Sequence, residues 1–262
     1  MTSELGTTLV TGANRGLGRA LVLELAGRGT RVIATARRVE ELADLPADQR
    51  LALDVTSPES VGAAAAAAGP VDTLINNAGI SVGAAVEDTP ADVAAALFDT
   101  NVLGPMRLIS AFVPGMRERG SGTVVNVSSV GAHASFPLNG VSGACKSALE
   151  TISETLALEA GPLGIRVIVL QLGAVGTDMF EHQPRYVSPA YEHLDRAQRE
   201  AYAAGQGRGA DPADVARQIV DRISSADTPL RIPIGDDAAG LLQARAATDD
   251  AAWYARLTGG RS

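Results

Sequence analysis

Three polar side chains near the middle of the chain have types and spacings that could do chemistry. Ser129 follows an apolar run, Gly122–Ser128, whose length and β-branched residues are typical of a buried strand. Ser142 and Lys146 lie in a helical pattern that extends from about 141 to 159. Because these two residues are four positions apart, they share one face of the helix. We therefore expect hydroxyl and ammonium groups that can hold or move a proton to meet at one cleft.

A glycine-rich turn near the amino terminus has the form of an anion-binding site. Thr7–Thr11 is predicted to be a strand, and a helix is expected from Arg19 to Arg28 after the turn. Glycine residues let the backbone approach a pyrophosphate, and the free N–H groups of the first helical turn point at it. The pattern predicts a dinucleotide site that includes these residues of the turn: Gly12, Asn14, Arg15, Gly16, Leu17 and Gly18.

The end of the second predicted strand indicates which dinucleotide binds. That strand spans Thr30–Thr35 and is followed by Ala36 and Arg37. A site that prefers NAD has an acidic residue near this point, where it binds the ribose 2′-hydroxyl. Here no acid is present, and the guanidinium groups of Arg15 and Arg37 suit a 2′-phosphate. Both arginines could instead be solvated surface charges, but the combination favours NADP(H).

The chain resembles the short-chain dehydrogenase/reductase family in three motifs. The glycine turn has the family's T-G-x-x-x-G-x-G spacing, and an N-N-A-G sequence occupies 76–79. The family's active site is a serine followed thirteen residues later by Tyr-x-x-x-Lys. Ser129 and Lys146 match this template, but Ser142 stands at the tyrosine position. The resemblance covers about 7–235 and implies an oxidoreductase that uses a nicotinamide cofactor.

The same resemblance implies roles for further residues. Asn101 matches an asparagine that holds a water beside the lysine, so the implied catalytic set is Asn101, Ser129, Ser142 and Lys146. Lys146 would also hold the nicotinamide ribose. Asp54 matches a residue that contacts the adenine, although it could instead cap the helix that follows Pro58. The cofactor residues expected outside the glycine turn are Arg37, Asp54, Val55, Asn77, Ala78, Gly79, Lys146, Gly173, Val175 and Thr177.

For three other positions the sequence predicts a structural role and no part in catalysis. Leu172 stands where the family has proline, which fixes φ and lacks an N–H, so the loop that follows is expected to be slightly freer. Asn76 is expected to bind backbone groups and to steady the central sheet. Cys145, beside the lysine, is interpreted as a small packed residue and not as a nucleophile.

Ser142 raises the question of which group protonates the substrate oxygen. In the family a phenol does so, whereas an alkyl hydroxyl is a far weaker acid on a shorter side chain. A substrate that needs no strong acid, such as an iminium or a conjugated enone, would remove the difficulty. Otherwise a water held by Ser142, Lys146 and Asn101 could relay the proton. Alternatively, His133, Tyr186 or Tyr191 could supply it directly.

These observations leave three functions open. The first is NADP(H)-dependent reduction of a carbonyl, enone or imine group in a small or medium apolar substrate, with an atypical proton donor. The second is an NADP(H)-binding pseudoenzyme that acts as a partner or sensor. The third is a non-redox isomerase or cyclase that reuses the pocket. The retention of Ser129, Lys146 and Asn101 favours catalysis, because a pure binder would not need all three.

Strand and helix patterns alternate along the chain and predict an α/β fold. We expect a Rossmann-type, doubly wound parallel sheet in three α/β/α layers, with residues 1–262 in one domain. Residues 178–208 lack a sheet pattern and are expected to form a lid over the substrate. The other expected elements are a long helical segment at 90–119, a helix at 212–224, a last strand at 230–234 and a helical tail at 236–257.

Composition restricts the partners and the compartment. The formal net charge of −8 argues against nucleic acid and anionic membrane surfaces, and no apolar run has the length of a membrane span. With the first strand expected near Thr7, no signal peptide is expected. A single cysteine fits a reducing cytoplasm, and no metal site is expected. The family commonly pairs through two long helices, here 90–119 and 141–159, which implies a homodimer or homotetramer.

Overall fold

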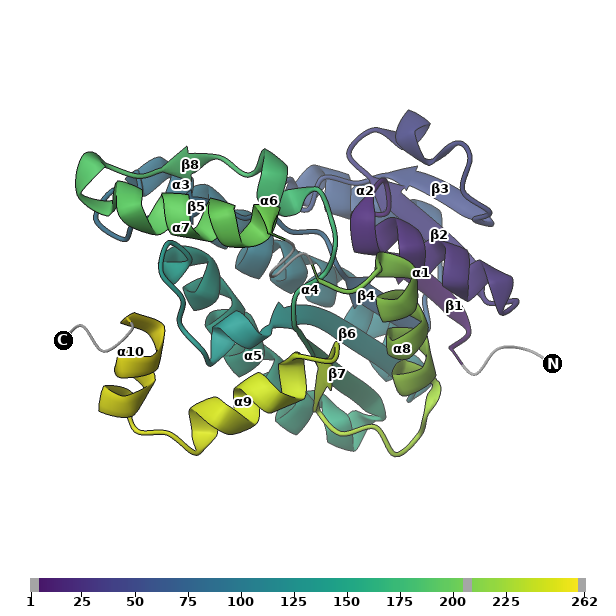
Figure 1. Ribbon diagram of the computed structural model, residues 1–262. Helices are drawn as coiled ribbons and strands as arrows, with labels where there is room; N and C mark the ends of the chain where they lie inside the picture. Colours follow the sequence, from purple (N-terminus) through teal and green to yellow (C-terminus); the bar gives the residue numbers. More distant parts are fainter. Residues whose placement is uncertain (1–4, 205–208, 259–262) are drawn as a thin grey trace.

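The computed structural model describes residues 5–204 and 209–258, and its centre is a parallel sheet of seven strands (Figure 1). The strand order is β3-β2-β1-β4-β6-β7-β9, so the chain winds outward from β1 in one direction and then in the other. This confirms the predicted doubly wound α/β fold. The strands are β1 (Thr7–Val10), β2 (Arg31–Ala36), β3 (Gln49–Ala52), β4 (Thr73–Asn76), β6 (Gly122–Ser129), β7 (Ile165–Leu172) and β9 (Arg231–Ile234).

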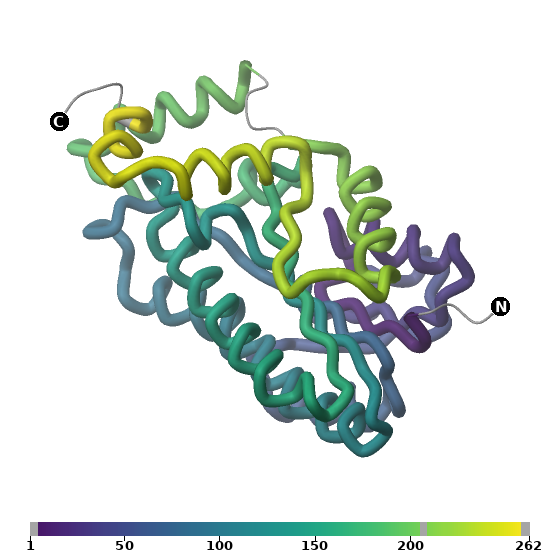
Figure 2. The backbone as a smooth tube through the Cα atoms, turned by 90° about the horizontal axis from the view of Figure 1, so that it is seen from below, coloured from purple at the N-terminus to yellow at the C-terminus, as the bar shows by residue number. Residues whose placement is uncertain are grey.

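Helices cover both faces of the sheet and complete three layers (Figure 2). On one face α1 (Gly16–Gly27) and α8 (Pro212–Ser224) bury leucine, isoleucine and valine side chains against the strands. On the other face α2 (Pro58–Ala68), α4 (Gly104–Arg119) and α5 (Gly140–Ala160) form a second apolar cluster. Because both faces are covered, the central strands carry nearly continuous apolar runs, which is the property that made them recognisable in the sequence.

The long helical segment predicted at 90–119 is interrupted. It consists of α3 (Ala91–Phe98), a π-helical turn at Asp99–Leu103, and α4. Asn101 lies within the π-helical turn and is buried. Such turns within α-helices are frequent at functional sites, because the wider turn redirects backbone and side-chain groups.

The predicted lid contains more regular structure than its sequence pattern indicated. It has α6 (Met179–His182), β8 (Arg185–Tyr186) and α7 (Glu192–Ala203). The expectation of no sheet was wrong, since β8 pairs in parallel with β5 (Gly83–Ala84). Two-residue strands leave no periodic trace in a sequence. Residues 205–208 of the predicted lid lie outside the described part of the chain.

The expected helical tail forms two helices, α9 (Ala238–Ala246) and α10 (Asp250–Thr258). Trp253 of α10 is 1% exposed, so this last helix packs onto the body of the protein. Nowhere in residues 5–204 and 209–258 is there a helix with the length and apolarity needed to cross a bilayer.

Candidate active site

The glycine turn between β1 and α1 is shaped for close approach of a ligand. Gly12 and Gly16 have φ values of +66° and +53°, a region that favours glycine. A Cβ atom at Gly18 would overlap the carbonyl oxygen of Gly12, so only glycine fits where the helix meets the turn. Arg15 precedes the helix and makes no side-chain bond to its first turn. The N–H groups of that turn therefore point toward the anion position without a side-chain acceptor, and the turn fits a dinucleotide pyrophosphate.

Asn77 stabilises this turn through hydrogen bonds to Thr11, the residue before Gly12. Its Nδ2 atom donates to the backbone oxygen of Thr11 at 2.8 Å, and its backbone N–H donates to Thr11 Oγ1 at 3.0 Å. The role expected for Asn76 was wrong, because its Nδ2 donates to the side-chain oxygen of Asn126, 2.7 Å away, and not to backbone. Asn77 is thus the member of the N-N-A-G motif that binds the backbone, whereas Asn76 joins a buried side-chain pair between β4 and β6.

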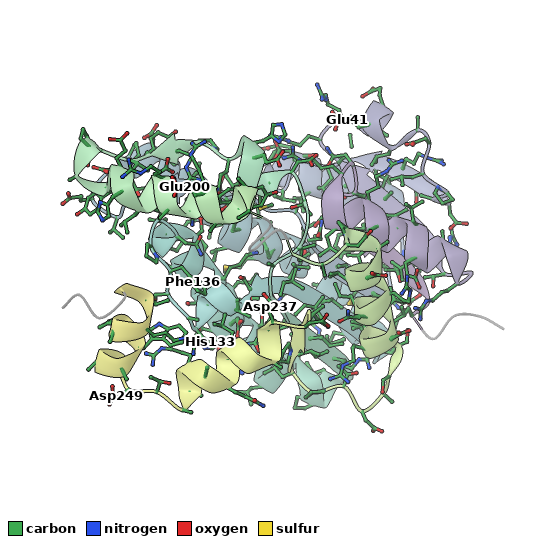
Figure 3. The ribbon with its side chains drawn as sticks, viewed as in Figure 1. Glu41, His133, Phe136, Glu200, Asp237 and Asp249 are labelled. Carbon is green, nitrogen blue, oxygen red and sulfur yellow. The ribbon has the colours of Figure 1, made fainter. Side chains whose placement is uncertain are left out.

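Two cations stand free where a ribose 2′-phosphate is expected. Arg15 and Arg37 are exposed, and within residues 5–204 and 209–258 neither forms an ion pair. By contrast, their neighbour Arg38 pairs with Glu41, which also accepts a hydrogen bond from Asn14 Nδ2 at 2.8 Å (Glu41 is labelled in Figure 3). Arg15 and Arg37 therefore have guanidinium groups available for an anionic ligand.

Asp54 lies just beyond β3 at the same edge of the sheet. Its carboxylate accepts from the N–H and the hydroxyl of Thr56 at 2.9 and 2.7 Å. These bonds lower the pKa of Asp54, with smaller contributions from Arg37 and Arg107. The helix after it is capped by Ser57, whose hydroxyl accepts from the Ser60 N–H, so Asp54 is not the helix cap. Asp54 and its neighbour Val55 thus remain candidates for the adenine side of the site.

Lys146 lies on α5 and is the only lysine in the chain. Its ammonium donates to the backbone oxygen of Val127, 2.7 Å away. Burial lowers the pKa of Lys146 to about 8, because a charged ammonium is less well solvated there than in water. A titratable group with a pKa near neutrality is what proton transfer requires.

The other three predicted catalytic residues differ in how their side chains are bonded. Ser129 Oγ accepts from the Gly131 N–H at 3.1 Å. Asn101 binds the backbone of Ile80 in both directions, at 2.9 and 2.8 Å. The Oγ atom of Ser142 is buried and has no hydrogen-bond partner in the part of the chain that the structure describes. The Asn101 amide is thus engaged by Ile80, whereas the Ser142 hydroxyl has no partner among the described residues.

The loop after β7 lies beside the glycine turn. Thr177 lies beside the glycine turn, because a Cβ at Gly16 would be 3.2 Å from its methyl group. At Gly173 a Cβ would overlap the carboxylate of Asp237, which accepts from the backbone N–H of Ala174 at 3.1 Å (Asp237 is labelled in Figure 3). The loop is thus held against the start of α9.

The freedom expected from Leu172 is not observed. Leu172 extends β7, in register with Ser129 on one side and Ile234 on the other. The next residue, Gly173, donates its N–H to the backbone oxygen of Ile234 at 2.9 Å. A residue with an N–H lets the strand ladder continue where proline would interrupt it, so the start of the loop is fixed more firmly.

The residues that the sequence placed at strand ends thus lie at one edge of the parallel sheet, where the carboxyl ends of the strands are found. This arrangement agrees with a match to a family profile. The sequence profile described as short chain dehydrogenase matches residues 6–186. The chain belongs to the short-chain dehydrogenase/reductase family.

Individual relatives agree with this assignment. An uncharacterised oxidoreductase, YusZ of Bacillus subtilis, is 32% identical over 248 residues, which is 87% of this chain and 88% of that protein. A short-chain dehydrogenase from Streptomyces avermitilis has a solved structure with a TM-score of 0.83, 38% identity and coverage of 97% of this chain and 96% of that one. Another, from Burkholderia cenocepacia in complex with NADP, has a TM-score of 0.77, 28% identity and coverage of 98% and 99%.

The alternative proton donors considered for this dehydrogenase have the following surroundings. His133 faces Glu150, with Nε2 and Oε2 2.9 Å apart. Tyr191 bonds to Glu87, which raises the pKa of the phenol and makes it a weaker acid. Tyr186 packs against an apolar cluster that includes Cys145. That cysteine is buried, and burial raises the pKa of its thiol, in agreement with its interpretation as an unreactive packed residue.

Glu150 and Asp237 contribute to this dehydrogenase site and were not singled out in the sequence. Glu150 has a signal there, because Ser142, Lys146 and Glu150 are spaced by four and so follow one face of α5. Asp237 has no comparable signal, since it meets Gly173 only after β7 and β9 have paired. Among the described residues, histidine, cysteine and carboxylate side chains form no group that could hold a metal ion.

Proposed function

We propose that this short-chain dehydrogenase is an NADP(H)-dependent oxidoreductase that reduces a carbonyl, enone or imine group of a small or medium apolar substrate. One observation carries the proposal: the glycine turn shaped for a pyrophosphate follows β1, and the single lysine, partly buried and with a lowered pKa, bonds to Val127 near the same end of the neighbouring strand β6. The first would hold a dinucleotide, and the second could transfer a proton beside its reactive end.

NADP(H) is the proposed cofactor because of the unpaired arginines. Arg15 and Arg37 would bind the 2′-phosphate, the N–H groups after Gly12 would bind the pyrophosphate, and Lys146 the nicotinamide ribose. Gly173, Val175 and Thr177 would contact the nicotinamide amide, as the family resemblance implies. The NADP complex of the Burkholderia relative supports this choice. When bound, the cofactor supplies the hydride.

Lys146 is the proposed proton source. An ammonium with a pKa of about 8 is a stronger acid than a free phenol, whose pKa is about 10. Of its three N–H groups one is bound to Val127, so two remain for the ribose and for the substrate oxygen or a water next to it. Lys146 would give one proton to that oxygen, become a neutral amine, and regain a proton from solvent.

Loss of NADPH absorbance with a panel of ketones, enones and imines tests the function. We expect turnover of at least one class by the unmodified protein, with a preference for NADPH over NADH. Tight NADPH binding without turnover of any class would contradict the redox proposal, and failure to bind NADPH would contradict the cofactor assignment as well.

The substitution Arg37→Asp tests the choice of cofactor. It removes a charge-assisted bond to the 2′-phosphate and adds repulsion, so we expect NADPH affinity to fall about 10–100-fold while NADH affinity changes little. Fluorescence titration measures both. Arg38→Asp is the matched control, because Arg38 already pairs with Glu41 and should affect the two cofactors alike. Equal losses of NADPH and NADH in the Arg37 variant would refute the assignment.

A second candidate is an NADP(H)-binding pseudoenzyme without redox turnover. It is favoured by Ser142, whose buried hydroxyl is a far weaker acid than the phenol that the family has at this position. The absorbance experiment separates the two functions, because only the first consumes NADPH.

We further propose that the chain forms a homodimer or homotetramer in the cytoplasm. Apolar side chains are exposed along the segment from α3 to α4, at Phe98, Leu103 and Met106, and at Leu158 on α5. Exposed apolar residues on these two segments favour association through them, and the single, buried cysteine is compatible with a reducing compartment. Light scattering at micromolar concentration should give a multiple of 26.8 kDa; a monomer would refute this proposal.

A further inference from the structure

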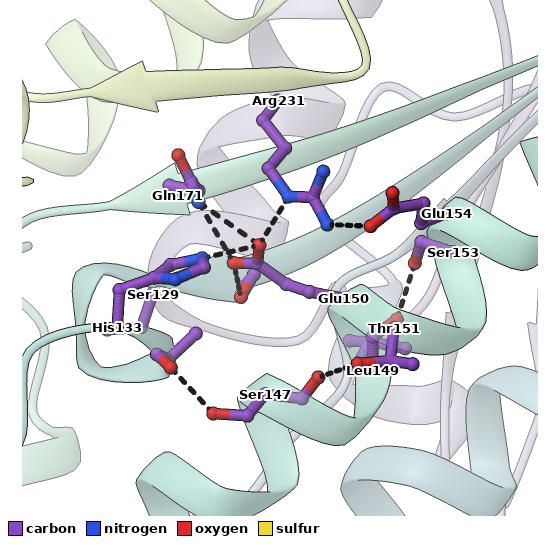
Figure 4. Close-up of polar contacts among 12 residues, drawn as sticks. Ser129, His133, Ser147, Leu149, Glu150, Thr151, Ser153, Glu154, Gln171 and Arg231 are labelled. Atoms are coloured by element: carbon purple, nitrogen blue, oxygen red, sulfur yellow. Dashed lines mark hydrogen bonds and ion pairs between the residues drawn. The ribbon is translucent and has the colours of Figure 1, made fainter.

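A buried carboxylate follows the proposed proton donor by one turn of α5. The side chain of Glu150 is 3% exposed. It accepts hydrogen bonds from Ser128 Oγ at 2.7 Å and from Arg231 Nε at 2.9 Å, and its Oε2 lies 2.9 Å from His133 Nε2 (Figure 4). The amide of Gln171 donates to both carboxylate oxygens, at 3.3 and 3.1 Å. No other acidic side chain in the described chain is buried as completely.

The partners of Glu150 come from the elements that carry the active site. Ser128 immediately precedes Ser129 at the end of β6, and Gln171 stands two residues before Gly173 at the end of β7. Glu150 itself follows Lys146 by one turn of α5. One carboxylate therefore links the strand end beside Ser129, the strand end before the nicotinamide loop, and the helix that presents the lysine.

This carboxylate is an anion. Burial alone would raise the pKa of Glu150, but hydrogen bonds from His133, Ser128 and Arg231 outweigh burial and lower it. The charged or titratable groups that face it are His133, Arg231 and the preceding lysine; Arg231 is shared with Glu154, whose Oε2 lies 2.7 Å from its Nη2.

The negative charge of Glu150 affects the pKa of Lys146. Two groups raise the pKa of this lysine against the larger opposing effect of its burial, namely Cys145 and Glu150. The Cys145 thiol is buried and its pKa is raised, so at neutral pH it carries no charge. Glu150 is then the ionised group that stabilises the ammonium.

We propose that Glu150 is a positioning residue of this site: it fixes the strand ends beside Ser129 and Gly173 relative to α5, and it supplies the negative charge that keeps Lys146 protonated. Its relevance to catalysis rests on the function proposed above. Its effect on Lys146 is a property of the protein without cofactor or substrate, and can be measured separately.

The single lysine makes the measurement direct. Protein grown with lysine labelled at the ε-carbon gives one lysine side-chain signal, and its chemical shift against pH reports the titration of Lys146. In Glu150→Gln the isosteric amide keeps the shape but loses the charge, so we expect the midpoint to move to lower pH. NADPH affinity should change less than turnover at pH 7.5, because the variant leaves the glycine turn and both free arginines intact.

Glu154→Gln is the matched control. It removes the other carboxylate bound to Arg231, one turn further along α5, and should leave the midpoint unchanged. Glu150→Asp keeps the charge and should give a midpoint nearer to that of the unmodified protein than the glutamine variant does. If Glu150→Gln does not fold, a displaced midpoint in Glu150→Asp supports the proposal, since only the carboxylate has moved.

The role of Glu150 would be overturned if Lys146 titrated identically in the unmodified protein and in Glu150→Gln. Where the glutamine variant does not fold, identical titration in the unmodified protein and in Glu150→Asp would overturn it. Because neither measurement needs a substrate, this result would not depend on whether the protein turns over NADPH. A shifted midpoint together with absent turnover would leave the role of Glu150 in place and contradict only the redox function.

Discussion

Replacing Ser142 by tyrosine is expected to raise the rate of NADPH-dependent reduction by about 10²–10⁴-fold, the usual contribution of a positioned general acid. Ser142 and Lys146 lie on the same face of α5, so a phenol at 142 would extend past the enclosed serine position toward the cleft. The neighbouring ammonium would lower its pKa and make it a better donor. The rate is measured from the loss of NADPH absorbance, by stopped-flow or steady-state kinetics.

Ser142→Phe is the control for this experiment. It adds the aromatic ring without the hydroxyl, so any gain from improved packing or exclusion of water appears in both variants. The expected gain belongs to the tyrosine alone. Equal rates in the serine and tyrosine proteins would mean that protonation does not limit the reaction, and a gain in both aromatic variants would assign it to packing.

The rate of reduction in the unmodified protein is expected to fall as pH rises through about 8. Below this pH Lys146 is an ammonium and can donate a proton; above it the amine is neutral and cannot. Lys146→Arg keeps the positive charge and the capacity to bind a ribose, but a guanidinium does not lose its proton at these pH values. We expect this variant to lose about 10²-fold or more in kcat and to keep most of its affinity for NADPH.

The pH profile and the arginine variant test the same step independently. A rate that is level from pH 6 to pH 10, or an arginine variant with an undiminished kcat, would show that the proton comes from another group. In Ser142→Tyr the phenol donates the proton instead of the lysine. The pH at which the rate falls should then differ from the midpoint of the Lys146 titration measured by NMR.

The fold could be predicted because its signals are local. Each central strand is covered on both faces, so Val124, Val125 and Val127 appear as one apolar run, and the helices between strands show their own period. The glycine turn is also local: Gly12, Gly16 and Gly18 are needed by geometry within a single strand–turn–helix unit. The residues at the strand ends followed from the direction of winding.

The rest depends on contacts between distant parts of the chain. The partners of Glu150 come from β6, β7 and β9, and no spacing in the sequence indicates that they meet. The pairing of β5 with β8 joins segments about a hundred residues apart through two residues each. The enclosed state of the Ser142 hydroxyl and the lowered pKa of Lys146 are likewise products of packing, which residue types alone do not reveal.

The presence of only one lysine also bears on how this protein can be modified after synthesis. Lys146, the proposed proton donor, is partly buried, and every other basic side chain that carries a fixed charge is arginine. The folded surface thus offers no side-chain amine for acetylation or for the attachment of a degradation tag. The one side-chain amine that an acylating reagent could modify is that of Lys146, so if Lys146 donates the proton, labelling of a side-chain amine and inactivation should proceed together.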